Sequence, residues 1–297
     1  ERLISIPKVF FYYIKTFIFP RDLAVDQSWV VKQISFFDFY IPLFGIIILI
    51  IAIVYGGYWL FRKKTILIYW YIFFGLTFII GMSLHIQILP LDLTVSDRWF
   101  YFPMICVLGM IGCIVSSLRI KSENIKKVII SALILIIMIL AIRTHVRNNN
   151  WQDNITLAEH DLKIAPDSFQ LNSILGVEYS RLGRYDDAEK YLKKSVELNP
   201  NWAVSWNNLG VLYIRMGKPD EAKEAFKKSI QIGKLNLAYE NMALLLLIYD
   251  TPEKAHKYTT DLIKIYPTNN KLWWILAYIE YKRGNLSGAL AASEKAY

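Results

Sequence analysis

Cysteine and histidine are scarce in this chain of 297 residues. Two cysteines, Cys106 and Cys113, exclude a disulfide-stapled scaffold, and their spacing favours packing residues of one apolar helix. The chain also lacks a phosphate-binding glycine loop and a nucleophilic serine elbow. The four histidines are too scattered for a metal site: His85, His145, His160 and His256. We therefore expect neither a metal nor a cofactor.

Acidic residues are few in the first half of the chain. Residues 1–150 hold 15 Lys+Arg and 7 Asp+Glu, a net charge of +8, whereas the remaining residues hold 19 and 18. The excess lies beside long apolar runs, so membrane topology explains it better than nucleic acid, and no nucleic-acid partner is expected. A composition that is 55% hydrophobic and 15% aromatic excludes a disordered chain. The chain starts at Glu1 without a signal-peptide pattern, and we interpret it as a piece of a longer protein.

Four uncharged runs predict membrane-spanning helices, at 39–61, 65–91, 99–118 and 128–142. A span needs about 20 apolar residues. The first three runs reach that length, and the basic residues that flank the fourth can snorkel to extend it. Basic clusters at 62–64 and 119–127 predict cytoplasmic loops by the positive-inside rule. Residues 1–38, the loop around 84–98 and everything after about 145 would then be extracytoplasmic.

The segment 6–19 is apolar and aromatic, but Lys8 and Lys15 interrupt it and Pro20 ends it. This pattern favours a helix that lies in the membrane interface, facing the extracytoplasmic side. A truncated fifth span is the alternative.

The second half repeats itself about every 34 residues. Leu175-Gly176, Leu209-Gly210, Met242-Ala243 and Leu276-Ala277 recur in phase, each followed by a second helical pattern. The pattern resembles the tetratricopeptide repeat (TPR) family. It predicts a half repeat at 151–166, repeats at 169–202, 203–235 and 236–269, and a truncated repeat at 270–297, after which we expect the array to continue. Gly183 and Gly217 should adopt a positive φ at the turns, whereas the third repeat lacks a small turn residue.

The TPR resemblance implies that the first helix of each repeat lines a concave groove for a polypeptide or partner protein. Mapped onto this sequence, the groove carries Ser173, Arg181, Asn207, Arg215, Glu240, Trp274, Tyr278 and Tyr281. The asparagine and the arginines suit a peptide backbone or an acidic group, and the aromatic residues suit a side chain or a sugar. The alternative is that the charges are solvated and the tyrosines pack against the continuation of the array.

One short polar segment, Ser96–Pro103, stands at the mouth of the third apolar run. It reads Ser-Asp-Arg-Trp-Phe-Tyr-Phe-Pro, which puts an arginine that can bind phosphate at the membrane boundary. Arginine anchors and aromatic belts also occur at many spanning helices for purely structural reasons. On these residues alone both interpretations stay open.

The order of these features resembles the C-terminal half of the transmembrane-and-TPR O-mannosyltransferase-like proteins, which are GT-C glycosyltransferases. Asp97, Arg98, Tyr101 and Pro103 match that family's element before a late span. The resemblance implies a polyprenyl- or dolichyl-phosphate sugar as the donor and an acceptor hydroxyl, often of a protein Ser or Thr, on the extracytoplasmic side. Arg98 would bind the donor phosphate with Asp97 and Tyr101, and the catalytic residues would lie elsewhere. The family's acidic catalytic loop has no equivalent in these residues, so the fragment by itself should be inactive.

We therefore predict an all-α protein with multi-pass transmembrane helices followed by a TPR helical-hairpin superhelix. Its domains would be an interfacial helix and extracytoplasmic loop at 1–38, a four-span membrane domain at 39–147, and a TPR domain at 148–297. The expected partners are membrane lipid, the lipid-phosphate sugar, and an acceptor polypeptide or partner protein. One alternative is a non-enzymatic, membrane-anchored TPR adaptor for envelope protein assembly. Another is a polymerase or ligase of surface polysaccharide.

Overall fold

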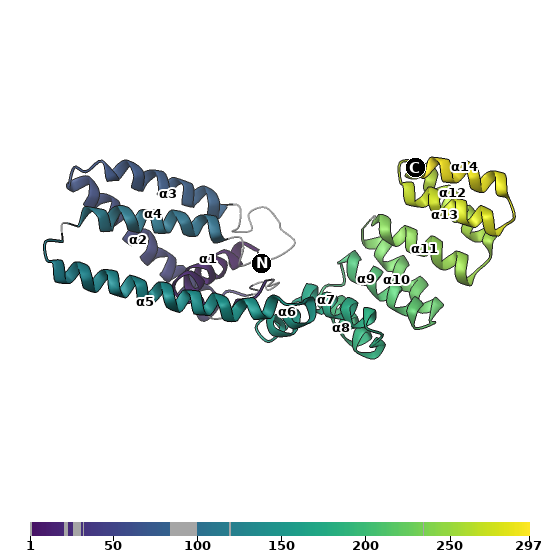
Figure 1. Ribbon diagram of the computed structural model, residues 1–297, viewed down its shortest axis with the longest axis horizontal. Coiled ribbons are helices and arrows are strands. Elements are labelled where there is room, and N and C mark those ends of the chain that lie inside the picture. Colours follow the sequence, from purple (N-terminus) through teal and green to yellow (C-terminus); the bar gives the residue numbers. More distant parts are fainter. Residues whose placement is uncertain are drawn as a thin grey trace. The chain divides into compact units, whose positions relative to one another are not determined.

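The computed structural model describes residues 2–20, 23–25, 31, 33–83, 100–118, 120–233 and 235–297. Within these ranges every regular element is helical, as the sequence predicts. The chain divides into two compact units, Glu1–Ser168 and Phe169–Tyr297. Both are drawn in Figure 1.

The first unit contains the apolar helices. Its elements are α1 (Arg2–Ile18), the π-helical turn η1 (Phe36–Tyr40), α2 (Ile41–Arg62), α3 (Leu67–Ser83), α4 (Tyr101–Ser117), α5 (Glu123–Asn148), the 3-10 turn η3 (Asn149–Trp151) and α6 (Asn154–Leu162). Two continuous helical stretches of the described chain are long and apolar enough to cross a membrane, Phe36–Arg62 and Glu123–Trp151. Helices α3 and α4 are apolar but have 17 residues each in the described chain. Of the four expected spans, two thus reach spanning length here.

The fourth apolar run lies inside a helix much longer than the run itself. Residues 128–142 form the middle of α5, which has 26 residues. Ser122 begins the helix, because its hydroxyl accepts a hydrogen bond from the Ile125 backbone N–H. None of the apolar window of Glu123–Trp151 is buried within the protein. An uncovered helix that is apolar on all sides indicates membrane association.

Helices α1 to α4 share one apolar core. Figure 1 shows α3 and α4 side by side, with α1 and α2 in the same unit. Tyr13 of α1 stacks on Phe100, with ring centroids 5.1 Å apart and planes 11° apart. Lys8 of α1 forms a 2.7 Å ion pair with Asp38 of η1. The segment expected in the membrane interface is therefore a packed helix with one buried face. Both cysteines are buried in this core, which confirms their role as packing residues.

The second unit consists of four consecutive helix pairs (Figure 1). The pairs are α7 (Phe169–Arg181) with α8 (Tyr185–Leu198), α9 (Ala203–Arg215) with α10 (Pro219–Ile232), α11 (Asn236–Tyr249) with α12 (Pro252–Ile265), and α13 (Asn270–Lys282) with α14 (Leu286–Lys295). Each second helix of the first three pairs is strongly amphipathic. A single pair cannot bury its apolar face alone, so neighbouring pairs stack to bury it.

In the first two pairs, a glycine with positive φ lies at the turn between the two helices. Gly183 and Gly217 have φ values of 77° and 69°, which confirms the predicted positive φ. The residue after each glycine donates its backbone N–H to a carbonyl one turn earlier, as Lys218 does to Tyr213 at 2.8 Å. The third pair turns differently, because Asp250 has a φ of −121° and the Thr251 hydroxyl caps α12. The missing glycine is thus replaced by a side-chain cap.

Gly210 lets α9 approach α10 closely. A Cβ atom at this position would lie 2.5 Å from the Phe226 ring. Phe226 is fully buried, so its ring has little room to move.

We expect Gly210→Ala to destabilise the α9–α10 pair by about 1–2 kcal/mol, because overpacking outweighs the gain in helix propensity. The measurement is hydrogen exchange of the α9 and α10 amides in the whole chain in detergent. Gly233→Ala is the matched control, since its Cβ would meet only ordinary contact, 3.4 Å from the Ala203 Cβ. Equal exchange in both variants would contradict the close-approach explanation.

Candidate functional site

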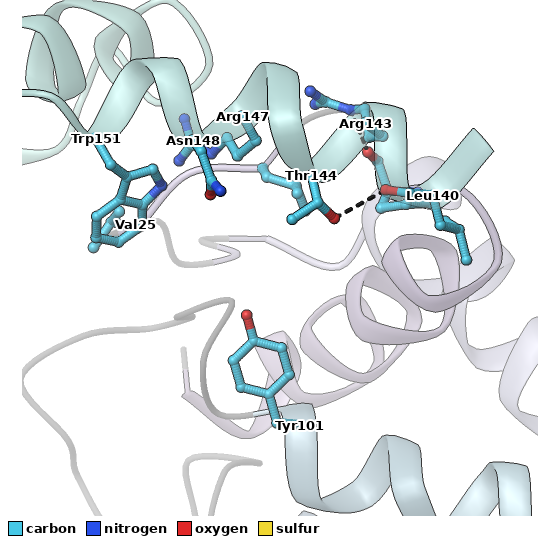
Figure 2. A pocket seen from close by; sticks show the side chains of 10 residues that line it. Val25, Tyr101, Leu140, Arg143, Thr144, Arg147, Asn148 and Trp151 are labelled. Carbon is cyan, nitrogen blue, oxygen red and sulfur yellow. Dashed lines mark hydrogen bonds between the residues drawn. The ribbon is translucent and has the colours of Figure 1, made fainter. Parts of the chain in front are cut away.

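A cavity of about 430 Å³ lies at the end of the apolar part of α5. Figure 2 shows the side chains that line it. The lining residues are Pro20, Leu23, Val25, Tyr101, Leu140, Arg143, Thr144, Arg147, Asn148 and Trp151. Tyr101, one of the three residues predicted to bind a donor phosphate, lines this cavity. Asp97 and Arg98 lie outside the described residues.

The cavity is bounded on one side by a single helical face. Thr144, Asn148 and Trp151 follow one another at helical spacing along the end of α5 and η3, so their side chains share that face. Tyr101, the first residue of α4, points its hydroxyl toward this face from the other side (Figure 2). A hydroxyl, an amide and a phenol thus surround a space that the Trp151 indole closes at one end.

The charged wall of the cavity is neutralised by a buried carboxylate. Arg147 is 7% exposed and donates two hydrogen bonds to the fully buried Asp161, at 2.8 and 3.1 Å. The Val25 backbone N–H donates to the same carboxylate at 2.7 Å. The His160 Nδ1 lies 2.9 Å from it. The arginine charge therefore already has a bidentate partner of opposite sign.

Arg143 is also held by the protein. Its Nε donates to the Pro20 carbonyl oxygen at 3.1 Å. In Figure 2 its guanidinium points away from Tyr101. This contact ties α5 to the residues that follow α1, across more than a hundred positions of the chain.

Sequence reasoning missed the Arg147–Asp161 pair and the cavity beside it. A weak signal was present, because Asp161 follows Ala158 and precedes Ala165 on the buried stripe of α6 and the turn after it. An acidic residue among buried positions needs a partner. The sequence does not say which of many basic residues that partner is.

Three of the predicted groove residues are buried links between neighbouring pairs. Ser173, Asn207 and Glu240 are each the fifth residue of their helix, in α7, α9 and α11. Each is less than 10% exposed. Ser173 accepts a hydrogen bond from Asn208 at 3.2 Å, and Asn207 accepts one from Asn241 at 2.9 Å.

Glu240 makes the corresponding link to the last pair. Its carboxylate accepts a 3.0 Å hydrogen bond from Asn269, the N-cap of α13, and forms a 3.0 Å ion pair with Lys271. In the same helices Arg215 donates to the Ser180 carbonyl at 2.9 Å, and the side chain of Arg181 is 65% exposed beside Glu178. Most polar residues predicted to line the groove thus form hydrogen bonds between neighbouring helix pairs.

Three predicted residues of α13 form an exposed aromatic face. Trp274, Tyr278 and Tyr281 are 55%, 41% and 60% exposed. The first two rings stack, with planes 7° apart and centroids 6.1 Å apart. We call these three side chains, together with Arg181, the first-helix face. Arg215 is also exposed, but its guanidinium is bonded to the Ser180 carbonyl, so it is not counted in this face.

An acidic residue of α8 also links its pair to the next one. Glu189 of α8 lies 2.7 Å from Lys193 and accepts a 3.4 Å hydrogen bond from the Tyr213 hydroxyl of α9. The hydrogen bond from Lys193 lowers the pKa of the Glu189 carboxyl. Over the described part of the chain, no three His, Cys, Asp or Glu side chains gather in a way that would hold a metal.

Comparison with known proteins supports the repeat assignment. Residues 167–234 match the tetratricopeptide repeat family. Protein O-mannosyl-transferase Tmtc2 of Drosophila melanogaster is 26% identical over 142 residues, which cover 48% of this chain and 15% of that protein. The chain therefore spans only a small part of that relative's length.

Several solved structures are similar to about half of this chain, with TM-scores below 0.5. MamA is 23% identical, with a TM-score of 0.42, over 48% of this chain and 84% of that one. PilF of Pseudomonas aeruginosa is 19% identical, with a TM-score of 0.44, over 53% and 72%. YrrB, a TPR protein with an unusual peptide-binding site, is 13% identical, with a TM-score of 0.39, over 48% and 74%. The family match at 167–234 and the helix pairs of the second unit show TPR-like hairpins, which follow a set of apolar helices in the chain.

We expect Asp161→Asn to destabilise the first unit by about 3–5 kcal/mol, because it leaves the buried Arg147 charge without a counterion. Glu123→Gln, which breaks the exposed 2.6 Å pair with Lys126, should cost less than about 1 kcal/mol. Hydrogen exchange of the α6 amides in the detergent-solubilised chain measures both effects. Adding Arg147→Met to Asp161→Asn should cost less than the sum of the single changes, and strict additivity would argue against direct coupling.

Proposed function

We propose that this chain is the C-terminal part of a membrane glycosyltransferase that moves a sugar from a polyprenyl- or dolichyl-phosphate donor to an acceptor hydroxyl. The observation that carries the proposal is a cavity with a few polar groups at the end of an apolar helix, in a chain that continues into TPR-like hairpins and resembles Tmtc2 over 142 residues. A hydroxyl of a protein Ser or Thr is the proposed acceptor.

In this proposal the apolar helices form a multi-pass membrane domain of the GT-C type. The basic residues after α2 and before α5 would face the cytoplasm, and the cavity and the hairpins would be extracytoplasmic. A second cavity, of about 590 Å³, supports a lipid substrate. It lies among α1, α2 and α3 and is lined almost wholly by apolar side chains, which suits the hydrocarbon chain of the donor.

Arg98 is the proposed ligand of the donor phosphate. A guanidinium binds phosphate through two parallel hydrogen bonds, and a neighbouring carboxylate such as Asp97 can orient it. Tyr101 follows in the same element and lines the 430 Å³ cavity, which supports a donor site near the start of α4. The general base that activates the acceptor hydroxyl is expected outside residues 1–297, so the tests use the full-length protein.

The second unit is proposed to bind the acceptor polypeptide. Its first-helix face offers a cation at one end and exposed aromatic rings at the other. Aromatic rings and arginine supply much of the binding energy at protein interfaces, because both combine apolar area with polar contacts.

Arg98→Ala in the full-length protein should lower kcat/KM for transfer from a lipid-phosphate sugar by about 30-fold or more, since a charge-assisted bidentate contact is worth about 2–3 kcal/mol. Arg98→Lys should retain part of the activity. Lys126→Ala, which removes an exposed cation at the start of α5, is the control and should leave transfer unchanged. Unchanged transfer in Arg98→Ala would contradict the proposed binding of the donor phosphate by Arg98. A full-length protein without any transfer activity would favour a non-enzymatic, membrane-anchored adaptor.

Combining Arg181→Ala with Tyr281→Ala should raise KM for a polypeptide acceptor about tenfold and leave kcat nearly unchanged, because the face contacts the acceptor away from the reacting atoms. Lys194→Ala, which removes an exposed cation on α8, is the matched control. Kinetics with a short and a long acceptor peptide would measure the effect. A loss of kcat at unchanged KM would contradict acceptor binding by this face.

A further inference from the structure

We propose that the cavity of Figure 2 binds a neutral sugar ring through Thr144, Asn148, Tyr101 and Trp151. The identification of that ring with the sugar of the donor rests on the proposed function. The sugar site itself rests on the chemistry of the lining.

The polar groups of the lining match the hydroxyl groups of a sugar. The hydroxyls of Thr144 and Tyr101 donate and accept hydrogen bonds, and the Asn148 amide does both through separate atoms. Thr144 uses its donor within α5, since its hydroxyl bonds the Leu140 carbonyl at 2.9 Å, which leaves its oxygen as an acceptor. Trp151 offers an aromatic surface for the C–H face of a sugar ring. A volume of about 430 Å³ falls within the range of small-molecule sites.

The charges of the described residues that line the cavity favour a neutral ligand over an anion. Arg147 is already paired with Asp161 by two hydrogen bonds, and the carboxylate is fully buried. Arg143 donates its Nε to the Pro20 carbonyl and points away from the Tyr101 side (Figure 2). A phosphate or a uronate would have to compete with the buried carboxylate for Arg147. A neutral sugar needs only the amide and the hydroxyl groups.

The same buried pair pre-organises the wall of the site. Arg147 lies 5.8 Å from the Trp151 ring centroid, in a cation–π contact. Asp161 holds Arg147 and also receives the Val25 backbone N–H. Val25 is therefore held before a ligand arrives, and Arg147 gives the exposed indole one orienting contact, which lowers the entropic cost of binding.

The cavity also lies at a suitable depth for a lipid-linked sugar. The uncharged run of α5 ends at Ile142, and the polar lining begins with the next two residues, Arg143 and Thr144. This transition is where the hydrocarbon of a membrane gives way to its polar interface. A sugar attached to a lipid through a short polar link would be presented at this level.

The test uses the complete chain in detergent and saturation-transfer NMR with methyl α-D-mannopyranoside as the probe. Because free sugars bind weakly, we expect saturable binding in roughly the millimolar range. Asn148→Ala and Trp151→Ala should each weaken it by about fivefold or more. Asn149→Ala removes an exposed asparagine that does not line the cavity and should leave binding unchanged. Methyl glucuronide, which is anionic, and inorganic phosphate should compete less well than the neutral probe.

Trp151→Phe keeps an aromatic ring and separates lost binding from lost folding. It should retain part of the affinity, and hydrogen exchange of α5 and α6 should match the unsubstituted chain. No saturable binding of the neutral probe would overturn the proposal. So would equal loss in Asn148→Ala and Asn149→Ala, or stronger binding of phosphate than of the sugar.

The outcome is separable from that of the proposed function. If the neutral sugar binds at Asn148 and Trp151 but the full-length protein transfers no sugar from a lipid phosphate, the site stands and the transferase function fails. If transfer depends on Arg98 but the probe binds independently of Asn148 and Trp151, the function stands and this site fails.

Discussion

One buried carboxylate, Asp161 of α6, joins two of the segments that line the cavity, the end of α5 and the residues around Val25 that the structure describes. It accepts hydrogen bonds from Arg147 at the end of α5 and from the Val25 backbone, and it belongs to α6 itself. A buried charge is costly without a partner, so these contacts form together or not at all. The orientation of Trp151 follows from them, because Arg147 contacts its ring. One wall of the cavity thus depends on a single ion pair.

In the second unit, stacking between pairs has the same organising role. In α7, α9 and α11 the fifth residue is polar, buried and hydrogen-bonded to the next pair, as Asn207 is to Asn241. These bonds set the register between neighbours, because a buried polar group is stable only with its partner in place. In α13 the equivalent residue is Trp274, which is exposed. The last described pair therefore presents a surface of different chemistry from the others.

In both units, the polar side chains available for a ligand lie next to the apolar packing that holds the helices together. In the first, the uncharged run of α5 gives way at residue 143 to the side chains that line the cavity. In the second, the close contacts at small residues such as Gly210 leave the first helices free to carry varied side chains on their other faces. This arrangement separates the residues that maintain the fold from those available for a ligand.

The sequence by itself determined the features that are local or periodic. The repeats, the positive φ at Gly183 and Gly217, and the apolar runs depend on residues within one or two turns of each other, and the structure has them. Only the tertiary structure decided that Arg147 pairs with Asp161 and that Tyr101 faces the end of α5 across a cavity. It also decided that Asn207 is buried between pairs rather than exposed in a groove. These outcomes depend on which distant groups meet, and no repeating pattern along the chain encodes that.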